Sequence, residues 1–487
     1  MTPTLSRIPV GRRARWLLTA LAACALATGC ADLSGITPKA RQTEPAAVGL
    51  ATTADTRVDW PAERWWQAHG DERLAALVER ALEGNPSLMA AQARLERALS
   101  LVDDAESQSG PGLGGTVDVT RQRFSETGLV PGTLAGRTRS TYAATLNFGW
   151  ELDFFGRHRA ALQAALGGVR AAEAELQAAR VLLASQVVGG WIELARLQAQ
   201  RRLARDTLAQ NEQLLALVRQ RTQAGLDSRV ELRRAEGTLP QARAMLEGLE
   251  GEIALARHAL AVLSAQQPQA LAGLDATLPA RSTGALPTEL PADLLGRRAD
   301  ILAARWRIEA ALGARDETRA RFYPNVNLGA FFGVSSLNLS QWLDAGSRTW
   351  GVGPAIRLPM FDTGGLRAEL RGRTAGLDEA VHVYNGAIAN AAREVADHLA
   401  SLQALARRDT EQRLALAAAE DAHALALERY RAGLGTYLDV LSAQASVTAE
   451  RRLVADLDAR AAALHAGLAR ALGGGYDAAD SRPHGSS

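Results

Sequence analysis

The chain repeats itself once, and this duplication constrains its fold more than any other feature of the sequence. Three pairs of segments match, and they occur in the same order in both halves: 85–95 with 298–308, 152–155 with 358–361, and 221–226 with 429–434. A period of about 200 residues is too long for a solenoid of short repeats. The sequence therefore predicts two copies of one large unit, at 61–275 and 276–475.

Each repeat contains one very long segment of helical pattern without proline, at 156–223 and at 365–431. At ~1.5 Å per residue, each helix would be roughly 100 Å long, which a globular core does not need but a structure that crosses the periplasm does. Shorter helices are expected at 228–264 and 436–472, after glycine-marked turns. Their apolar residues lie three and four apart, which is typical of a coiled-coil seam. We therefore expect two long α-helical hairpins.

Two segments in each repeat alternate between apolar and polar residues, as β-strands do. The clearest is 139–154, and the others are expected at about 114–124, 324–335 and 349–360. Each has about ten residues, the length of a transmembrane β-strand, and aromatic residues lie near the ends or on the apolar face. A soluble four-stranded sheet packed on a helix is the alternative.

Four strands are too few to close a barrel in lipid. Each unpaired backbone group costs several kcal/mol in hydrocarbon, and the smallest membrane barrels have about eight strands. Three copies would supply twelve strands, with Asn147, Asn325 and Asn327 on a polar face that lines a wet interior. We therefore predict a mainly α-helical chain in which long coiled-coil hairpins form a periplasmic tunnel and four strands contribute to a trimeric twelve-stranded membrane β-barrel.

Residues 1–29 have the pattern of a lipoprotein signal peptide: arginines precede an apolar segment that is too short to span a bilayer. The residues before Cys30 resemble a lipobox, so Cys30 is the predicted acylated residue, followed by an extended lipidated linker at 30–60. Cys24 fits the local pattern better but leaves too few apolar residues before it. An ordinary signal peptide with an incidental cysteine is the alternative. Residues 476–487 are expected to form a flexible tail.

The composition and motifs exclude several classes of protein. A net charge of +2, from 55 basic and 53 acidic residues, gives no electrostatic footprint for nucleic acid. No His-Glu-x-x-His or Gly-x-Ser-x-Gly motif is present, so we expect no catalytic site, no metal and no cofactor. No later segment has about 20 consecutive apolar residues, which argues against an inner-membrane helical transporter. A coiled-coil lipoprotein that tethers the membrane to the wall would leave the four alternating segments unexplained.

Several motifs, in their order and spacing, resemble the outer-membrane factor family, and most closely its TolC-like, NodT-type lipoproteins. They lie at 65–71, 85–88, 290–301, 430–433 and 437–441. The resemblance covers about 55–475. It implies a homotrimer in outer-membrane lipid that works with a periplasmic adaptor protein and an inner-membrane pump of the resistance-nodulation-division (RND) class. The implied function is an exit duct that conducts drugs passively; the channel of a type I protein secretion system is the alternative.

The resemblance also implies two sites. The adaptor is expected to dock on the hairpin tips, at Gly225, Leu226, Ser228, Gly433, Leu434 and Thr436. The alternative is that the two glycines only permit the turns. The resting tunnel is expected to close just above the tips, with gate candidates Leu438, Asp439, Ser442, Glu231 and Arg229. The family often has Leu-Asp-Ala-Gln-Arg at 441–445, where this chain lacks the Asp and the Arg. That argues against a charge-pair lock at those two positions.

Overall fold

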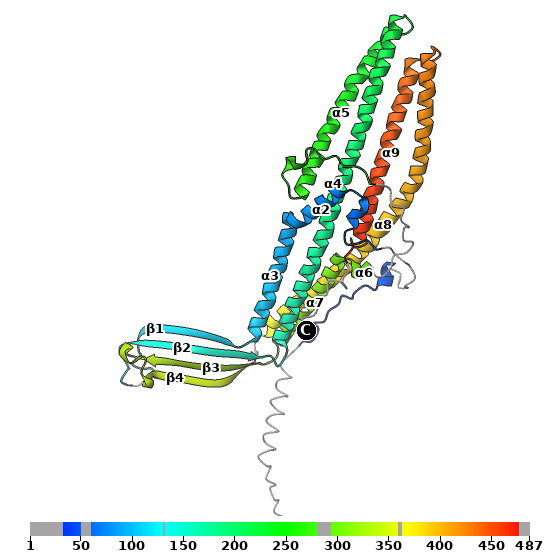
Figure 1. Ribbon diagram of the computed structural model, residues 1–487. Coiled ribbons are helices and arrows are strands. Elements are labelled where there is room, and N and C mark those ends of the chain that lie inside the picture. Colours follow the sequence, from blue (N-terminus) through cyan, green and yellow to red (C-terminus); the bar gives the residue numbers. More distant parts are fainter. Residues whose placement is uncertain (1–32, 50–59, 130–131, 280–293, 359–362, 477–487) are drawn as a thin grey trace, which may run out of the picture. The chain divides into compact units, whose positions relative to one another are not determined.

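The computed structural model describes residues 33–49, 60–129, 132–279, 294–358 and 363–476 (Figure 1). The chain forms two compact units. Unit 1 contains residues 1–42, 95–171 and 304–384, and unit 2 contains residues 43–94, 172–303 and 385–487. Both cysteines, the predicted signal peptide and most of the predicted tail lie outside the described residues.

Unit 1 contains one antiparallel sheet in the order β1-β2-β3-β4 (Figure 1). The strands are β1 (Gly112–Arg123), β2 (Thr138–Leu152), β3 (Asn325–Ser336) and β4 (Arg348–Arg357). Each β-hairpin keeps its own two strands adjacent, and β2 pairs with β3 across the two repeats. Strands β1 and β4 each have a neighbour on one side only, so the sheet has two open edges.

Residues directly opposite each other on paired strands lie on the same face, so the register divides the sheet into two faces. We call one the apolar face; its residues on β2 and β3 include Tyr142, Leu146, Trp150, Leu328 and Phe332. The other is the polar face, which holds Asn147, Asn325 and Asn327, with Thr116 and Asp118 on β1. The expected alternation is therefore continued across all four strands.

The helices of the chain are long, and four of them run from one unit into the other. These four are α3 (Pro86–Ser109), α4 (Arg157–Gln223), α7 (Ala299–Ala320) and α8 (Thr363–Arg431). Unit 2 also contains α2 (Glu72–Gly84), α5 (Arg229–Leu263), α6 (Leu294–Arg297) and α9 (Tyr437–Ala471). Short 3-10 turns complete the described elements: η1 (Pro45–Val48), η2 (Trp65–His69), η3 (Pro268–Leu271), η4 (Leu339–Gln341) and η5 (Ala345–Ser347).

In unit 1, α4 and α7 pack closely enough to require glycine at the contact. A Cβ atom on Gly313 would lie 2.6 Å from the amide nitrogen of Ala164, and one on Gly167 would lie 2.7 Å from that of Ala310. Both distances are shorter than a van der Waals contact. This crossing joins a helix of the first repeat to a helix of the second.

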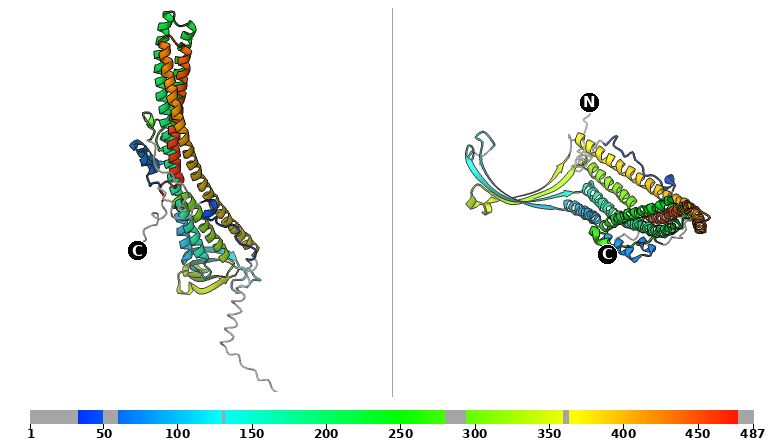
Figure 2. Two further views of the ribbon diagram at one scale, coloured as in Figure 1. Left: turned by 90° about the vertical axis from the view of Figure 1, so that its right-hand side faces the viewer. Right: turned by 90° about the horizontal axis from the view of Figure 1, so that it is seen from above.

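In unit 2, two antiparallel hairpins, α4–α5 and α8–α9, lie side by side (Figure 1, Figure 2). Their main core contains Trp65 and Trp66 of η2, apolar side chains of α2, and residues of α4, α5 and α9. The Asn85 side chain donates a hydrogen bond to the Leu263 carbonyl, which ties the start of α3 to the end of α5. The expected coiled-coil seam of α5 is buried in this core, including Leu249, Ile253 and Leu260.

The second repeat motif, residues 290–301, contains a buried ion-pair network. The Arg298 guanidinium is almost fully enclosed and contacts Asp300 at 2.7 Å and Glu394 at 2.9 Å. It also donates a hydrogen bond to the Ala471 carbonyl at 3.1 Å. Arg298 therefore holds the start of α7 against α8 and the end of α9, and these carboxylates compensate the cost of burying its charge.

One helix among the described residues, α4, is long and apolar enough by composition to cross a membrane. The sequence pattern did not predict such a stretch. The reason is packing: α4 places Leu183, Val187, Val188, Trp191 and Leu194 in the unit 2 core, where they are almost fully buried. A helix that packs into a protein core over much of its circumference has an apolar composition without lying in a lipid bilayer.

Candidate functional site: the hairpin tips

The first hairpin turns at Gly225, which has φ +75°. The Leu226 amide donates to the Arg221 carbonyl at 2.9 Å, and the Gly225 amide donates to the Thr222 carbonyl at 3.1 Å. These two bonds form a Schellman motif, which closes the end of a helix and needs a residue that tolerates positive φ. Glycine at this position is therefore explained by the turn itself.

The second hairpin repeats this geometry. Gly433 has φ +77°, and its amide donates to the Tyr430 carbonyl at 3.1 Å. The Leu434 amide donates to the Arg429 carbonyl at 2.8 Å. The two turns present Leu226 and Leu434 at equivalent positions, 67% and 72% exposed. Each tip thus ends in one exposed leucine on a hydrogen-bonded turn.

Capping boxes start the returning helices. The Ser228 hydroxyl accepts the Glu231 amide, and the Glu231 carboxylate accepts the Ser228 amide at 2.6 Å. Thr436 and Asp439 form the same pair at the start of α9, with the Thr436 amide 2.9 Å from the Asp439 carboxylate. Two gate candidates, Glu231 and Asp439, therefore have a local role in capping helices.

We expect Ser228→Ala and Thr436→Ala each to destabilise the start of the following helix by about 1 kcal/mol, because each removes an N-cap acceptor. Acid should loosen the second tip too. Hydrogen bonds from Thr436 lower the pKa of Asp439 below its ordinary value of 3.8. The cap is therefore fully effective above about pH 3.8 and is lost as pH falls through the lowered pKa. Amide protection, corrected for the pH dependence of intrinsic exchange, should fall at 437–441 in Thr436→Ala and in acid, and at 229–233 in Ser228→Ala; equal protection in Thr436→Ala and the unchanged protein would contradict the cap.

A buried polar link joins the two tips. The Asp227 carboxylate, only 5% exposed, accepts hydrogen bonds from Arg221 Nε at 3.1 Å and from the Tyr430 hydroxyl. The Arg221 guanidinium also lies over the Tyr430 ring, 4.5 Å from its centroid. Burial and the neighbouring Asp227 raise the pKa of Tyr430, and the hydrogen bond to Asp227 raises the pKa of Arg221. The hydroxyl therefore stays protonated and donates to Asp227.

This link was not predicted from the sequence, although the sequence contains a signal for it. When the two repeats are aligned at the tips, Tyr430 stands opposite Thr222 and Asp227 stands opposite Gly435. The two partners of the link therefore occupy positions at which the halves differ. Below the link, Tyr437 and Val440 of the second hairpin pack with an apolar group of the first: Leu214, Leu215, Val218 and Ala235.

The remaining gate candidates lie on the surface of the single chain. Leu438 is 54% exposed, and the exposed Ser442 donates a hydrogen bond to the Asp439 carbonyl at 3.0 Å. Arg229 lines a shallow depression with Val230, Arg233 and Arg234. The structure therefore places these candidates within the first two turns of α5 and α9, next to the tips.

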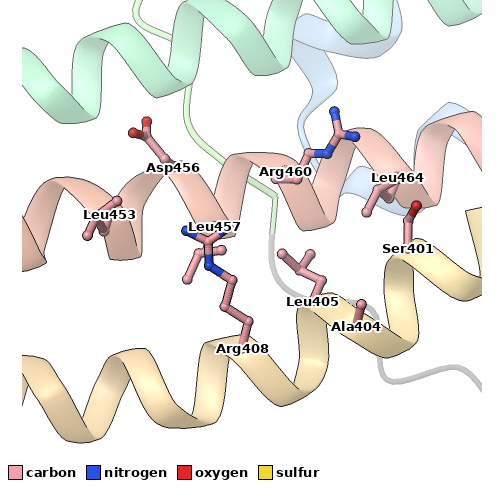
Figure 3. A pocket seen from close by; sticks show the side chains of 9 residues that line it. All are labelled: Ser401, Ala404, Leu405, Arg408, Leu453, Asp456, Leu457, Arg460 and Leu464. Atoms are coloured by element: carbon pink, nitrogen blue, oxygen red, sulfur yellow. The ribbon is translucent and has the colours of Figure 1, made fainter.

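A second depression lies farther along the hairpins, between α8 and α9 (Figure 3). Ser401, Ala404, Leu405 and Arg408 line it from α8, facing Leu453, Leu457 and Leu464 of α9 (Figure 3). It is an open groove that mixes apolar and charged side chains. Among the described residues, no group of three His, Cys, Asp or Glu side chains is arranged to hold a metal ion.

Known proteins resemble this chain in fold and in sequence. Residues 77–266 and 290–474 match the model of the family described as "Outer membrane efflux protein". The chain is 34% identical to outer membrane protein OprJ of Pseudomonas aeruginosa, over 84% of this chain and 85% of OprJ. It is 32% identical to multidrug resistance outer membrane protein MdtQ of Escherichia coli O6:H1, over 92% and 95%. The crystal structure of outer membrane protein VceC of Vibrio cholerae superposes with a TM-score of 0.81 and 36% identity, over 86% of this chain and all of VceC.

The amphipathic sheet, the paired hairpins and these similarities define the class of protein: it has the fold of TolC-like outer-membrane channels. The chain belongs to the outer membrane efflux protein family. It is an outer-membrane protein, as the sequence predicted.

Proposed function

We propose that three copies of this chain form the exit duct of a tripartite efflux pump, which conducts drugs or other small toxic compounds passively out of the cell. The observation that supports this most directly is the sheet: it is apolar on one face, polar on the other and open at both edges. Such a sheet is stable in lipid only if other copies pair with its edges. The family description, outer membrane efflux protein, and the name of MdtQ, a multidrug resistance outer membrane protein, favour efflux of drugs over protein secretion.

The dimensions of the sheet support a membrane-spanning role. On β2 the apolar positions run from Tyr142 to Leu152, which is ten residue steps or about 33 Å along the strand. At a tilt of ~40° this corresponds to an apolar band about 25 Å tall, the height usual in outer-membrane barrels. The apolar face then meets lipid, and the polar face lines the water-filled pore.

The test is to measure subunit mass in detergent and conductance in planar bilayers on one purified sample. We expect a trimer with low resting conductance; a monomer without channel activity would refute the proposal. Deleting the gene should sensitise cells to dyes and detergents. If deletion instead stops release of a protein and leaves that sensitivity unchanged, the type I secretion alternative replaces efflux.

We propose that the periplasmic adaptor docks on the two tips, and that an inner-membrane RND pump completes the assembly. Support comes from the exposed Leu226 and Leu434, which stand on turns fixed by Gly225 and Gly433. The Leu226→Asp, Leu434→Asp pair should reduce cross-linking to the adaptor at least tenfold and leave conductance of the purified channel unchanged. Leu255→Asp, at an equally exposed leucine within α5, is the matched control. Unreduced cross-linking in the double variant would refute docking here.

We propose that the tunnel closes close to these tips, with Leu438 as an apolar element of the gate. Arg229 and Ser442 would supply polar contacts between copies, and Glu231 and Asp439 would act mainly by keeping the tip helices capped. The Asp227–Tyr430 bond adds a further closing element, because it holds the two hairpins of one copy together.

We propose that Cys30 is the lipidated residue. Residues just after it are fixed along α8 in unit 1: Asp378 accepts the Lys39 and Ala40 amides at 2.8 and 2.9 Å, and Arg367 donates to the Ser34 carbonyl at 3.0 Å. Cys30→Ser should abolish palmitate labelling, whereas Cys24→Ser should leave it intact; the reverse result would assign Cys24.

A further inference from the structure

The apolar face of the sheet ends in arginine at one end only. Strands β1 and β2 are joined by one loop and β3 and β4 by another, and both loops lie at the same end, which we call the loop end. There the register places Arg121 opposite Ser140, Arg123 opposite Thr138, and Arg348 opposite Val334, all on the apolar face. At the helix end the same face finishes with uncharged side chains: Leu113, Leu152, Val326 and Ile356.

Aromatic and apolar side chains lie directly inside these arginines. Trp350, two residues after Arg348, is exposed, and Tyr142 lies opposite Val119, two residues before Arg121. An arginine on the lipid-facing side of a barrel costs about 2–4 kcal/mol at the bilayer midplane and about 0–1 kcal/mol near the interface. By register Arg121 and Arg123 lie beyond Tyr142, outside the apolar band of β2, whereas Arg348 lies level with Ala144 and ends the apolar face on the edge strand β4. Long arginine side chains extend from such positions to the level of the lipid headgroups.

We propose that Arg121, Arg123 and Arg348 bind the phosphate groups of a phosphorylated glycolipid in the outer leaflet of the outer membrane. This inference rests on the proposed trimeric channel. In that channel the helical hairpins project into the periplasm, so the loop end of the sheet faces the outer leaflet.

The chemistry favours phosphate. The guanidinium group presents paired N–H donors that match two phosphate oxygens and keeps its charge at any physiological pH. The nearest acid is Glu126, which contacts Arg123 at 3.0 Å with both side chains 69% exposed. Such an exposed pair contributes little, so a phosphate can replace it. Of the other acids near this end, Asp118 lies on the polar face and Asp344 lies in the β3–β4 loop.

The position favours a lipid over a soluble anion. A ligand that binds these arginines also contacts Val119, Tyr142 and Trp350. These apolar and aromatic side chains pack favourably against acyl chains and sugar rings. In the proposed barrel of three copies, the β1 edge of one copy pairs with the β4 edge of the next, and neighbouring strands lie about 4.8 Å apart. Arg121 and Arg123 of one copy and Arg348 of the next would then lie on adjoining strands at the loop end of the apolar face.

The experiment counts lipids bound to the purified trimer by native mass spectrometry. Diphosphoryl lipid A is compared with the dephosphorylated glycolipid that has the same acyl chains. We expect the trimer to prefer the diphosphoryl form at least tenfold, and the Arg121→Gln, Arg123→Gln, Arg348→Gln triple variant to lose this preference. Arg139→Gln is the matched control, because Arg139 lies at the same end of the sheet but on the polar face, opposite Gln122.

Equal binding of the two lipids to the unchanged trimer would overturn the inference. So would a triple variant that keeps the preference, an Arg139→Gln variant that loses it equally, or inorganic phosphate that stabilises the trimer against heat as well as the lipid does. If the triple variant does not assemble, Arg121→Gln alone should show a partial loss of preference, and an unchanged preference there would overturn the inference. Conductance and mass on the same samples separate this result from failure of the channel proposal, which would appear as a monomer without conductance.

Discussion

Tyr430→Phe should raise the resting conductance of the reconstituted channel by at least one order of magnitude. The substitution keeps the ring over Arg221 but removes the hydroxyl that donates to the buried Asp227. A hydrogen bond to a charged group contributes about 2 kcal/mol, which corresponds to a factor of about thirty in the ratio of closed to open states if the bond breaks on opening. Each copy contributes one such bond, so a trimer would lose three.

Two further variants make this test specific. Asp227→Asn should also open the channel, and combining it with Tyr430→Phe should add little, because both remove the same contact. Arg233→Gln is the control: Arg233 forms an exposed pair with Glu236 near the same tip, and such pairs contribute little. If the Tyr430→Phe channel and the Arg233→Gln channel have the same resting conductance, the Asp227–Tyr430 bond does not keep the tunnel closed.

Gly313→Leu should prevent assembly of the trimer, and Gly313→Ala should destabilise the chain by about 2 kcal/mol. A Cβ atom at this position meets the backbone of α4, 2.6 Å from Ala164 N and 2.9 Å from Ala160 O. Backbone atoms of a packed helix have no rotamer by which to move away, so α4 and α7 must separate, and overpacking of this kind costs about 1–3 kcal/mol. Thermal unfolding of the detergent-solubilised protein and trimer yield measure the effect.

Adjacent glycines of α4 provide the matched control. Gly167 meets Ala310 of α7, whereas Gly168 has open space around it. Gly167→Ala should therefore destabilise the chain, but Gly168→Ala should stabilise it by up to about 1 kcal/mol through helix propensity. Equal effects of the two substitutions would mean that helix propensity, and not the close contact with α7, governs this part of α4.

The sequence predicted the elements of this protein closely. The long helices were expected at 156–223 and 365–431 and occur at Arg157–Gln223 and Thr363–Arg431. The strands lie within about three residues of the expected ranges, and the shorter helices begin within one residue of the expected positions 228 and 436. These features depend on neighbours in the chain. Helical periodicity, strand alternation and cap residues all report local structure, so a single sequence contains them.

Contacts between distant elements were not predictable in the same way. The Asp227–Tyr430 bond joins residues 203 positions apart, and the two cysteine-free repeats give no covalent constraint that would point to it. The glycine contacts between α4 and α7 likewise depend on where two helices cross. Arg298 was visible as part of a family motif, but its ion pairs with Asp300 and Glu394 follow only from the packing of α7, α8 and α9.

The sequence by itself predicted that the chain is duplicated, that it is built from long helices and short amphipathic strands, and that such strands need partners from other copies. The tertiary structure decided which side chains of the two repeats meet: Asp227 with Tyr430 at the tips, Gly313 with Ala164 where α4 crosses α7, and three arginines at one end of one face of the sheet. The physical reason is that periodicity shows which side of an element is buried. The register and crossing of packed elements determine which residue lies opposite which.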